Sequence, residues 1–575
     1  MDKPRIGIYT CWCGNNIAKM VDVEALAAEM ESMADVIVSK NYKYMCSDPG
    51  QDLIIKDIKE SHLNRVVVAA CSPRIHEMTF RKALQNAGLN PYLFQMANIR
   101  EHVSWVHTDR DEATRKARAL IRAAITRVSH HVPLTERAVA IHPATLIIGG
   151  GISGINAALD IADAGKKVYL IEKSAELGGL ASHVVEFYPY FDKGATIIRP
   201  LIDRVKKHGN IELFLETEVK DISGYIGNFE TAIVPKGGNE VKVSFGNIIV
   251  AVGLKPWDPS PLVNYGYGRF PDVITSWEFD EWLAAGNLTK KNGKLPQNIA
   301  IIHCVGSRNS KYHEYCSRIC CMVAIKYANQ LRSALPDANI YELYADIRAI
   351  SKGCEELYAS TSRNRVMFIM FDQEHELPEI IQADASDSCD MIIKVNDTRI
   401  RKRVEVPADM VVLMVSMDAR ETAKEVSHTV GVSLDKNHFF IEKHPKLDPV
   451  ATTTNGVYII GSCQGPKDVP DCVSQGRAAA ARVLGSISRG TAHVEVTTAF
   501  INPAQCCACR MCLDICPYTA ISYDESKHVS VVNEVLCQGC GTCVALCRTK
   551  AINIQGCTND QLMAELKALL LSDAR

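Results

Sequence analysis

Eight cysteines near the C-terminal end of the chain have the spacing of iron–sulfur ligands. The chain contains 22 Cys, and a Cys-x2-Cys-x2-Cys-x3-Cys run occurs in it twice, the second 31 positions after the first. Such runs bind [4Fe–4S] clusters, and where two runs are present the fourth Cys of each binds the other cluster. We therefore predict one cluster on Cys506, Cys509, Cys512 and Cys547, and another on Cys537, Cys540, Cys543 and Cys516. A pair of structural zinc sites is the alternative.

A glycine-rich turn between an expected strand and an expected helix indicates a dinucleotide cofactor. The strand Leu146–Ile148 is followed by Gly149, Gly151 and Gly154. Glycines at this spacing permit a tight turn, the close approach of a pyrophosphate and the packing of helix on strand. The next expected strand ends at Glu172, where a carboxylate can accept hydrogen bonds from ribose hydroxyls. We predict FAD here, with a purely structural dinucleotide fold as the alternative.

Further strings extend this pattern along the chain. They are Leu177-Gly178-Gly179, Ile248–Gly253 and Gly456–Gly461. Together with the first turn they resemble the two-dinucleotide flavoproteins to which thioredoxin reductase belongs. The resemblance implies FAD contacts at Gly149, Gly151, Ser153, Gly154, Glu172, Lys173, Gly178, Gly179, Val252, Gly253, Gly461, Lys467 and Asp468.

The second dinucleotide-like segment departs from those flavoproteins. After the strand Ile299–His303, a nicotinamide site needs another glycine-rich turn, but the chain continues with cysteines. NAD(P)H binding is therefore not expected there. Ligands of open α/β sheets bind at the carboxyl ends of the strands. We predict a further iron–sulfur cluster on Cys304, Cys316, Cys320 and Cys321, with buried free thiols as the alternative.

The N-terminal segment presents a similar case. Expected strands end at Cys11 and Cys71, Cys13 follows in Cys-Trp-Cys-Gly, and Cys46 lies in a loop. Parallel strands bring their carboxyl ends to one edge of a sheet, so these thiols can meet although they are far apart in the sequence. We predict a cluster on Cys11, Cys13, Cys46 and Cys71. A redox-active thiol pair and simple core packing are the alternatives.

The alternation of short apolar runs with amphipathic stretches positions these groups on an α/β fold. Four parts are expected. They are an N-terminal open parallel α/β iron–sulfur domain (1–140), a thioredoxin-reductase-like FAD domain (141–490) with a degenerate second dinucleotide-like subdomain (297–400), a two-cluster ferredoxin domain (491–556), and a C-terminal helix (557–575) that packs on its own chain or on a partner.

The composition excludes several classes of protein. With 64 basic and 66 acidic residues the net charge is -2, which offers no overall field for nucleic acid or an anionic membrane. The first residues carry no export signal, and no apolar run approaches the roughly 18 residues that span a bilayer. We therefore expect a cytoplasmic location, where many cysteines indicate metal ligation rather than disulfides.

Several ordered strings resemble the A subunit of heterodisulfide reductase, an iron–sulfur flavoprotein of anaerobes. They include Cys11-Trp-Cys-Gly, Cys46-Ser-Asp-Pro, Asn98-Ile-Arg-Glu-His102, Cys304-Val-Gly-Ser-Arg308, Cys316-Ser-Arg-Ile-Cys-Cys321 and Gln464-Gly-Pro-Lys-Asp468. The resemblance implies an oxidoreductase subunit whose FAD splits electron pairs by bifurcation, or joins them by confurcation. It also nominates Lys352 and Lys467 as catalytic residues beside the flavin, because a cation there shifts the flavin potential.

The same resemblance implies partners. They are proteins similar to the B and C subunits of heterodisulfide reductase, and a small iron–sulfur protein linked to a hydrogenase or formate dehydrogenase. The resemblance also implies electron exchange with ferredoxin and a homodimer within a larger complex. Typical members carry an inserted ferredoxin module where Leu213–Asn247 has no cysteine, so a short form is expected. This departure keeps open a class II benzoyl-CoA reductase complex or a quinone-interacting membrane-bound oxidoreductase. An NAD(P)H-dependent disulfide reductase is the less favoured alternative.

Overall fold

The computed structural model describes residues 3–286, 288–494 and 496–572. The chain divides into a first unit, Met1–Ala138 with His493–Arg575, and a second unit, Val139–Ala492. The short strands β5 (Arg137–Ala140) and β26 (Thr491–Val494) lie where the chain passes between them. Among the described residues, no helix has the length and apolar character needed to span a membrane.

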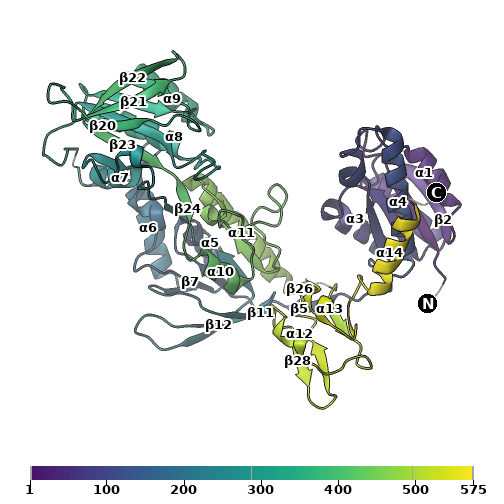
Figure 1. Ribbon diagram of the computed structural model, residues 1–575. Coiled ribbons are helices and arrows are strands. Elements are labelled where there is room, and N and C mark those ends of the chain that lie inside the picture. Colours follow the sequence, from purple (N-terminus) through teal and green to yellow (C-terminus); the bar gives the residue numbers. More distant parts are fainter. Residues whose placement is uncertain (1–2, 287, 495, 573–575) are drawn as a thin grey trace. The chain divides into compact units, whose positions relative to one another are not determined.

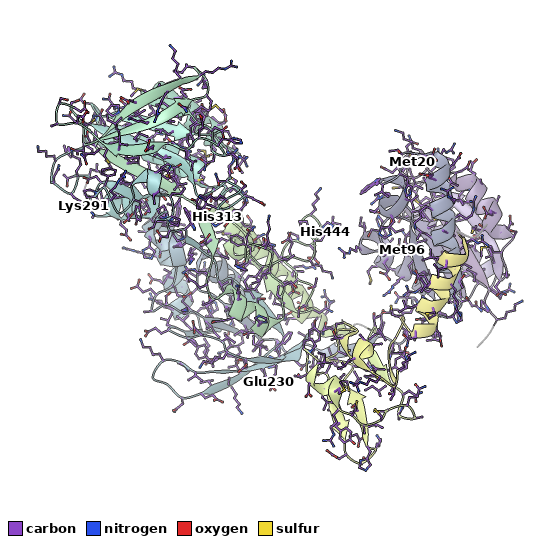
Figure 2. All side chains as sticks on the ribbon, in the orientation of Figure 1. Met20, Met96, Glu230, Lys291, His313 and His444 are labelled. Carbon is purple, nitrogen blue, oxygen red and sulfur yellow. The ribbon has the colours of Figure 1, made fainter. Side chains whose placement is uncertain are left out.

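The first unit begins with a four-stranded parallel sheet in the order β2-β1-β3-β4. Buried Met96 on β4 belongs to its core (Figure 2). The strands are β1 (Ile6–Cys11), β2 (Val36–Tyr42), β3 (Arg65–Ala70) and β4 (Phe94–Asn98). The helices are α1 (Val23–Glu31), α2 (Asp48–Glu60), α3 (Pro73–Asn86) and α4 (Arg110–Val128), and a π-helical turn η1 (Arg100–Ser104) follows β4. This is the open parallel sheet that the alternating pattern predicts.

The C-terminal helix α14 (Asn559–Ser572) lies along α4 (Figure 1). Arg127 of α4 pairs with Glu565 at 2.7 Å, and the amide of Gln561 donates to the carbonyl of His130 at 3.2 Å. The helix therefore packs on its own chain. Leu562, Leu566 and Leu570 of the same helix remain exposed.

The cysteine repeat folds into two similar halves. Strands β27 (Ala499–Ile501) and β30 (Ile552–Ile554) pair with each other, as do β28 (Ile521–Asp524) and β29 (Val529–Val532), and the short helices are α12 (Met511–Asp514) and α13 (Thr542–Leu546). Positive φ angles recur at the 31-residue offset, at Ala508 and Gly539, Arg510 and Gly541, and Thr519 and Lys550. The repeat in sequence is thus a repeat in backbone conformation.

The second unit contains two five-stranded parallel sheets. The first has the order β10-β7-β6-β14-β25, from β6 (Thr145–Ile148), β7 (Val168–Ile171), β10 (Ile211–Phe214), β14 (Asn247–Val250) and β25 (Val457–Ile459). Helices α5 (Ile152–Asp163) and α11 (Val469–Arg489) pack side by side in its core. Within the segment 213–247, between β10 and β14, lies the small antiparallel sheet β11 (Ile222–Tyr225), β12 (Asn228–Ile233) and β13 (Val241–Phe245).

The second parallel sheet has the order β16-β23-β17-β18-β19. Its strands are β16 (Val273–Thr275), β17 (Asn298–Val305), β18 (Asn339–Tyr344), β19 (Val366–Met370) and β23 (Met410–Val415), with α7 (Ser276–Ala284), α8 (Cys320–Ala334) and α9 (Cys354–Arg363) as helices. This sheet extends beyond the limits of 297–400 expected for the subdomain, because β16 and β23 lie outside them. An antiparallel sheet, β20 (Glu379–Gln382), β21 (Met391–Asp397) and β22 (Lys402–Ala408), adjoins it.

Candidate cofactor sites

One cavity of about 970 Å³ lies in the second unit. Elements of both five-stranded parallel sheets line this cavity, and a cavity lined in this way can hold an elongated dinucleotide. Most of the residues expected at FAD are in its wall, namely Gly149, Gly151, Ser153, Glu172, Lys173, Gly178, Gly179, Val252, Gly253, Lys467 and Asp468, together with Lys352.

Each of the three glycines after β6 is required for a different structural reason. Gly149 has a φ of +112°, and a Cβ on it would lie 2.3 Å from the carbonyl oxygen of Ala251. A Cβ on Gly154 would lie 2.0 Å from the carbonyl oxygen of Gly149, so this glycine permits α5 to pack on the turn. Gly151 precedes α5, lines the cavity and has no heavy atom near its Cβ position. The helix N-terminus therefore opens on space that a pyrophosphate can fill.

Glu172 holds the turn in place. Its carboxylate accepts hydrogen bonds from the backbone N–H of Gly150 at 2.7 Å and of Ser174 at 2.8 Å. Each carboxylate oxygen can accept more than one hydrogen bond, so Glu172 retains acceptor capacity toward the cavity. The neighbouring Lys173 pairs with Glu218 at 2.6 Å.

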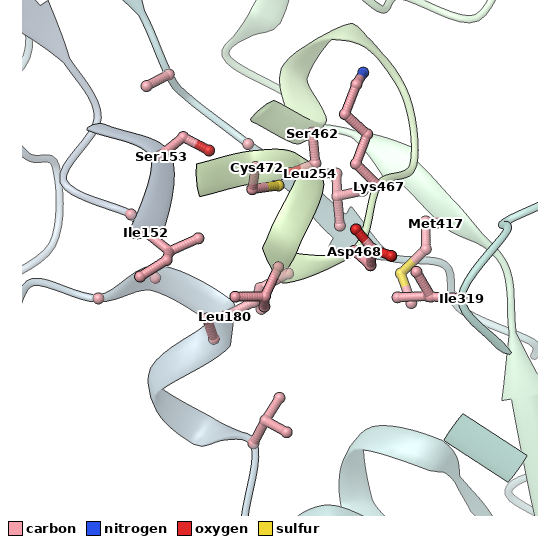
Figure 3. Close-up of a pocket in the computed structure, with 18 of the residues that line it drawn as sticks. Ile152, Ser153, Leu180, Leu254, Ile319, Met417, Ser462, Lys467, Asp468 and Cys472 are labelled. Atoms are coloured by element: carbon pink, nitrogen blue, oxygen red, sulfur yellow. The ribbon is translucent and has the colours of Figure 1, made fainter. Parts of the chain in front are cut away.

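Two of the residues expected to contact FAD lie behind the residues that line the cavity. Gly154 and Gly461 do not line the cavity. A Cβ on Gly461 would lie 2.1 Å from Oγ of Ser153, so Gly461 leaves room for the serine that does line it. Ser153 and Cys472 lie on this side of the cavity, on α5 and α11 (Figure 3). These two glycines support residues of the cavity wall without lining the cavity themselves.

The two lysines nominated by the family resemblance differ in environment. Lys352 is exposed, whereas Lys467 is partly buried and burial lowers its pKa. Burial raises the pKa of the adjacent Asp468, whose carboxylate also accepts the backbone N–H of Asp471 at 2.9 Å to cap α11. The amino group of Lys467 points away from that carboxylate (Figure 3). A partly buried cation thus stands at the cavity.

Sequence reasoning missed a third lysine in the cavity wall. Lys326 on α8 is 1% exposed, donates to the carbonyl of Glu186 at 3.0 Å and pairs with Asp280 of α7 at 3.3 Å. Burial lowers the pKa of Lys326 and raises that of Asp280. Its only sequence signal is one lysine on the apolar side of an expected helix, a position that more often holds a side chain reaching to solvent.

The structure brings the four cysteines of the second sheet together. Cys304 is the second-last residue of β17 and has a φ of +56°, and Cys320 and Cys321 begin α8. The sulfur of Cys316 accepts the backbone N–H of Arg318 at 3.3 Å. A hydrogen bond that Cys320 donates to Cys321, together with burial, raises the pKa of Cys320, and the charges of Cys321, Cys304 and Cys316 add to the rise. All four thiols therefore lie within electrostatic range of one another.

The pKa values of residues in and next to the Cys304 group are strongly shifted. Burial raises the pKa of Cys304 to about 12, while hydrogen bonds from Cys320 and His303 lower the pKa of Cys321. His303 is itself fully buried and hydrogen-bonded to Glu342. Burial lowers the pKa of His303, but the charges of Glu342 and Cys321 and hydrogen bonds with both residues together outweigh this and raise it to about 10.

The N-terminal cysteines also meet at one sheet edge. The sulfur of Cys11 accepts the backbone N–H of Cys13 at 3.3 Å and of Met45 at 3.4 Å. Burial raises the pKa of Cys71 to about 11, with Cys13 and Cys11 among the charges that add to it, and Cys46 acts on Cys11 in the same way. The loop carrying Cys46 and the ends of β1 and β3 thus bring these four thiols together.

Two small hollows in the C-terminal repeat are lined by crossed sets of cysteines. The first is lined by Cys506, Cys507, Cys509, Cys512 and Cys547. The second is lined by Cys516, Cys537, Cys540 and Cys543. The fourth cysteine of each run therefore lies with the first three of the other run. Among the described residues, no group of three or more Cys, His, Asp or Glu is arranged to hold a single metal ion.

A protein-family model described as "FAD dependent oxidoreductase" matches residues 145–252, which contain the glycine turn and Glu172. The chain is 37% identical to the A subunit of H(2):CoB-CoM heterodisulfide,ferredoxin reductase of Methanothermobacter thermautotrophicus, over 658 residues that cover 100% of this chain and 99% of that one. It is 36% identical to the iron-sulfur A 2 subunit of CoB–CoM heterodisulfide reductase of Methanopyrus kandleri, covering 91% of this chain and 92% of that one.

The chain belongs to the family of heterodisulfide reductase A subunits. The resemblance noted in the sequence is therefore confirmed, and the protein is an oxidoreductase subunit with an FAD-dependent oxidoreductase domain. The alignment of 658 positions exceeds the 575 residues of this chain by 83, so that relative has residues without counterparts here. That an inserted ferredoxin module accounts for them stays a prediction.

Among solved structures, T. acidophilum thioredoxin reductase is 17% identical, with a TM-score of 0.41, and covers 60% of this chain and 99% of that one. A likeness of this size carries no argument about function. The mixed α/β fold class is confirmed by the three parallel sheets themselves, whose strand orders are given above.

Proposed function

We propose that this chain is the electron-transfer flavoprotein subunit of an anaerobic heterodisulfide-reductase-type complex, with FAD in the cavity and [4Fe–4S] clusters at the four cysteine groups. The observation that carries the proposal is the position of Cys320. This residue lines the cavity and also belongs to the Cys304 group. A thiolate-held centre on that group would lie directly beside the flavin site.

The cavity residues fit FAD. Glu172 would accept from the ribose, the N-terminus of α5 with Gly151 and Ser153 would hold the pyrophosphate, and Lys467 would lie toward the ring. When bound, FAD supplies both two-electron and one-electron chemistry. Lys467 would stabilise negative charge on that cofactor, and the buried wall around Lys326 would exclude water.

The cysteine groups fit clusters rather than single ions. A cubane is larger than one ion, so its four thiolates stand further apart than the ligands of zinc. The crossed lining of the two C-terminal hollows supports the crossed ligand sets. With iron–sulfur potentials spanning about -700 to +450 mV, such centres can serve both branches of a bifurcating flavin.

We also propose the assembly. The name of the Methanothermobacter thermautotrophicus relative links hydrogen, a heterodisulfide and ferredoxin, and that of a Methanococcus maripaludis relative adds formate. Partners similar to the B and C subunits, with a small iron–sulfur protein from a hydrogenase or formate dehydrogenase, are consistent with these names. Co-purification under anaerobic conditions tests this assembly against a benzoyl-CoA reductase complex or a quinone-interacting oxidoreductase.

The cofactors are tested by anaerobic purification with iron, sulfide and flavin measured per chain. Four clusters require about sixteen irons with one FAD. About eight irons would reduce the Cys11 and Cys304 groups to ordinary thiols. A protein without flavin or sulfide would contradict the proposal as a whole.

A glycine substitution separates the cofactor from the fold. Gly151→Ala places a Cβ where no protein atom lies within 4 Å, so we expect normal folding but loss of most bound FAD. Gly209→Ala is the matched control, because its Cβ position is also open and its φ is not positive, but Gly209 does not line the cavity. Flavin absorbance and thermal unfolding are measured on both. Full flavin content in Gly151→Ala would contradict the proposed pyrophosphate site.

A further inference from the structure

Arg100 reaches the N-terminal cysteine group from the end of a neighbouring strand. β4 pairs with β3 so that Asn98 lies beside Ala70, and the backbone N–H of Ile99 donates to the carbonyl of Ala70 at 2.9 Å. The π-helical turn η1 begins directly afterwards at Arg100. Because Cys71 follows β3, this turn brings the arginine to the same sheet edge as the cysteines. Turns of this kind often occur at functional positions.

The guanidinium group of Arg100 donates directly to a cysteine sulfur. Its Nη1 lies 3.3 Å from Sγ of Cys13, and its Nε and Nη2 donate to one carboxylate oxygen of Glu101 at 3.3 and 2.7 Å. The guanidinium also lies over the ring of Trp105, 4.8 Å from its centre. The Arg100 side chain is 16% exposed, so solvent screens its charge less than that of a surface arginine.

The sulfurs of the C-terminal repeat have weaker partners. Cys512 contacts the hydroxyl of Ser530 at 3.3 Å, and Cys540 contacts that of Thr542 at 3.4 Å. Hydrogen bonds to charged groups are roughly twice as strong as those between neutral groups. Reduction adds one negative charge to an iron–sulfur centre, so a cationic donor at a ligand sulfur favours the reduced form.

We propose that Arg100 raises the reduction potential of the centre on Cys11, Cys13, Cys46 and Cys71 through its hydrogen bond to Cys13. The inference rests on the proposed function, because it requires a cluster at this group. Arg100 acts through the ligand and does not hold iron. Glu101 acts in the opposite sense, since its carboxylate partly offsets the guanidinium charge.

The test is a potentiometric titration of the full-length holoprotein under anaerobic conditions, followed by electron paramagnetic resonance. The signal of the N-terminal centre is assigned as the one that Cys46→Ala removes. We expect Arg100→Gln to shift its midpoint to a more negative potential, with Arg100→Lys retaining part of the wild-type value. Arg110→Gln is the matched control, because Arg110 lies on the surface and pairs there with a carboxylate, that of Asp22 at 3.6 Å, instead of a cysteine sulfur.

Glu101→Gln gives an independent readout of opposite sign. Removing the counter-charge is expected to shift the midpoint of the same signal to a more positive potential. An intact signal with an unmoved midpoint in Arg100→Gln would overturn the inference. If Arg100→Gln loses the centre, an unmoved or more negative midpoint in Glu101→Gln overturns it instead.

The iron content separates this inference from the proposed function. If Cys46→Ala removes neither iron nor signal, the N-terminal group holds no centre and the inference fails. FAD with about eight irons would then leave the flavin and the C-terminal clusters of the proposed function standing. A full complement of about sixteen irons with unmoved midpoints would overturn only the role of Arg100.

Discussion

The C-terminal repeat and the N-terminal cysteine group bring four thiols together by different means. In the repeat, three thiols of each hollow come from one short run, and the backbone conformation recurs in both halves. In the N-terminal group, thiols between Cys11 and Cys71 meet because parallel strands end at one edge. Local spacing specifies the first arrangement, whereas the order of strands in a sheet specifies the second.

The same two regions differ in how their sulfurs are surrounded. Hydroxyls and backbone N–H groups contact the sulfurs of the repeat, as Ser530 does for Cys512 and Ala499 for Cys537. A guanidinium contacts Cys13 in the N-terminal group. With clusters at both places, as proposed, nearby charge would act on the potential more strongly at the sheet edge than in the repeat.

The largest expected effect tests the local arrangement in the repeat. Cys509→Ala removes one of the four thiols proposed for the first hollow, so we expect the loss of about four irons per chain. Cys507→Ser is the matched control, because Cys507 lines the same hollow but lies outside the repeated spacing. Iron and sulfide analysis measures both. Equal iron loss in the two variants would show that spacing does not choose the ligand.

A second substitution asks whether a sheet edge in the other unit also holds a cluster. Cys321→Ser changes a thiol whose pKa is lowered by hydrogen bonds from Cys320 and His303, as suits a thiolate ligand. We expect the loss of about four irons, with the flavin retained.

Cys354→Ser is the control for that substitution. Cys354 is buried and, like Cys320, lines the cavity of the second unit, but it lies outside the proposed ligand set. Its iron content should equal that of the wild type. Unchanged iron in Cys321→Ser would return the Cys304 group to the alternative of buried free thiols.

The sequence predicted what local patterns determine. The strands and helices of the N-terminal sheet follow its apolar periodicity, and the meeting of Cys547 with Cys506 follows from the spacing of two runs. The boundaries of the second sheet did not follow, because β16 and β23 join it from distant positions. Arg100 and Lys326 were also missed, since each matters through a contact with a residue far away in the sequence.

The smallest expected effect measures the difference between a neutral and a charged partner of sulfur. Ser530→Ala removes the hydroxyl that lies 3.3 Å from Cys512. A neutral hydrogen bond contributes about 1 kcal/mol, roughly half of what a charged one contributes, so the midpoint of that centre should fall less than the N-terminal midpoint falls in Arg100→Gln. Potentiometric titration of both variants gives the two shifts. A Ser530→Ala shift as large as the Arg100→Gln shift would mean that the charge of Arg100 does not distinguish the sheet edge from the repeat. The two regions would then differ only in how their thiols are brought together.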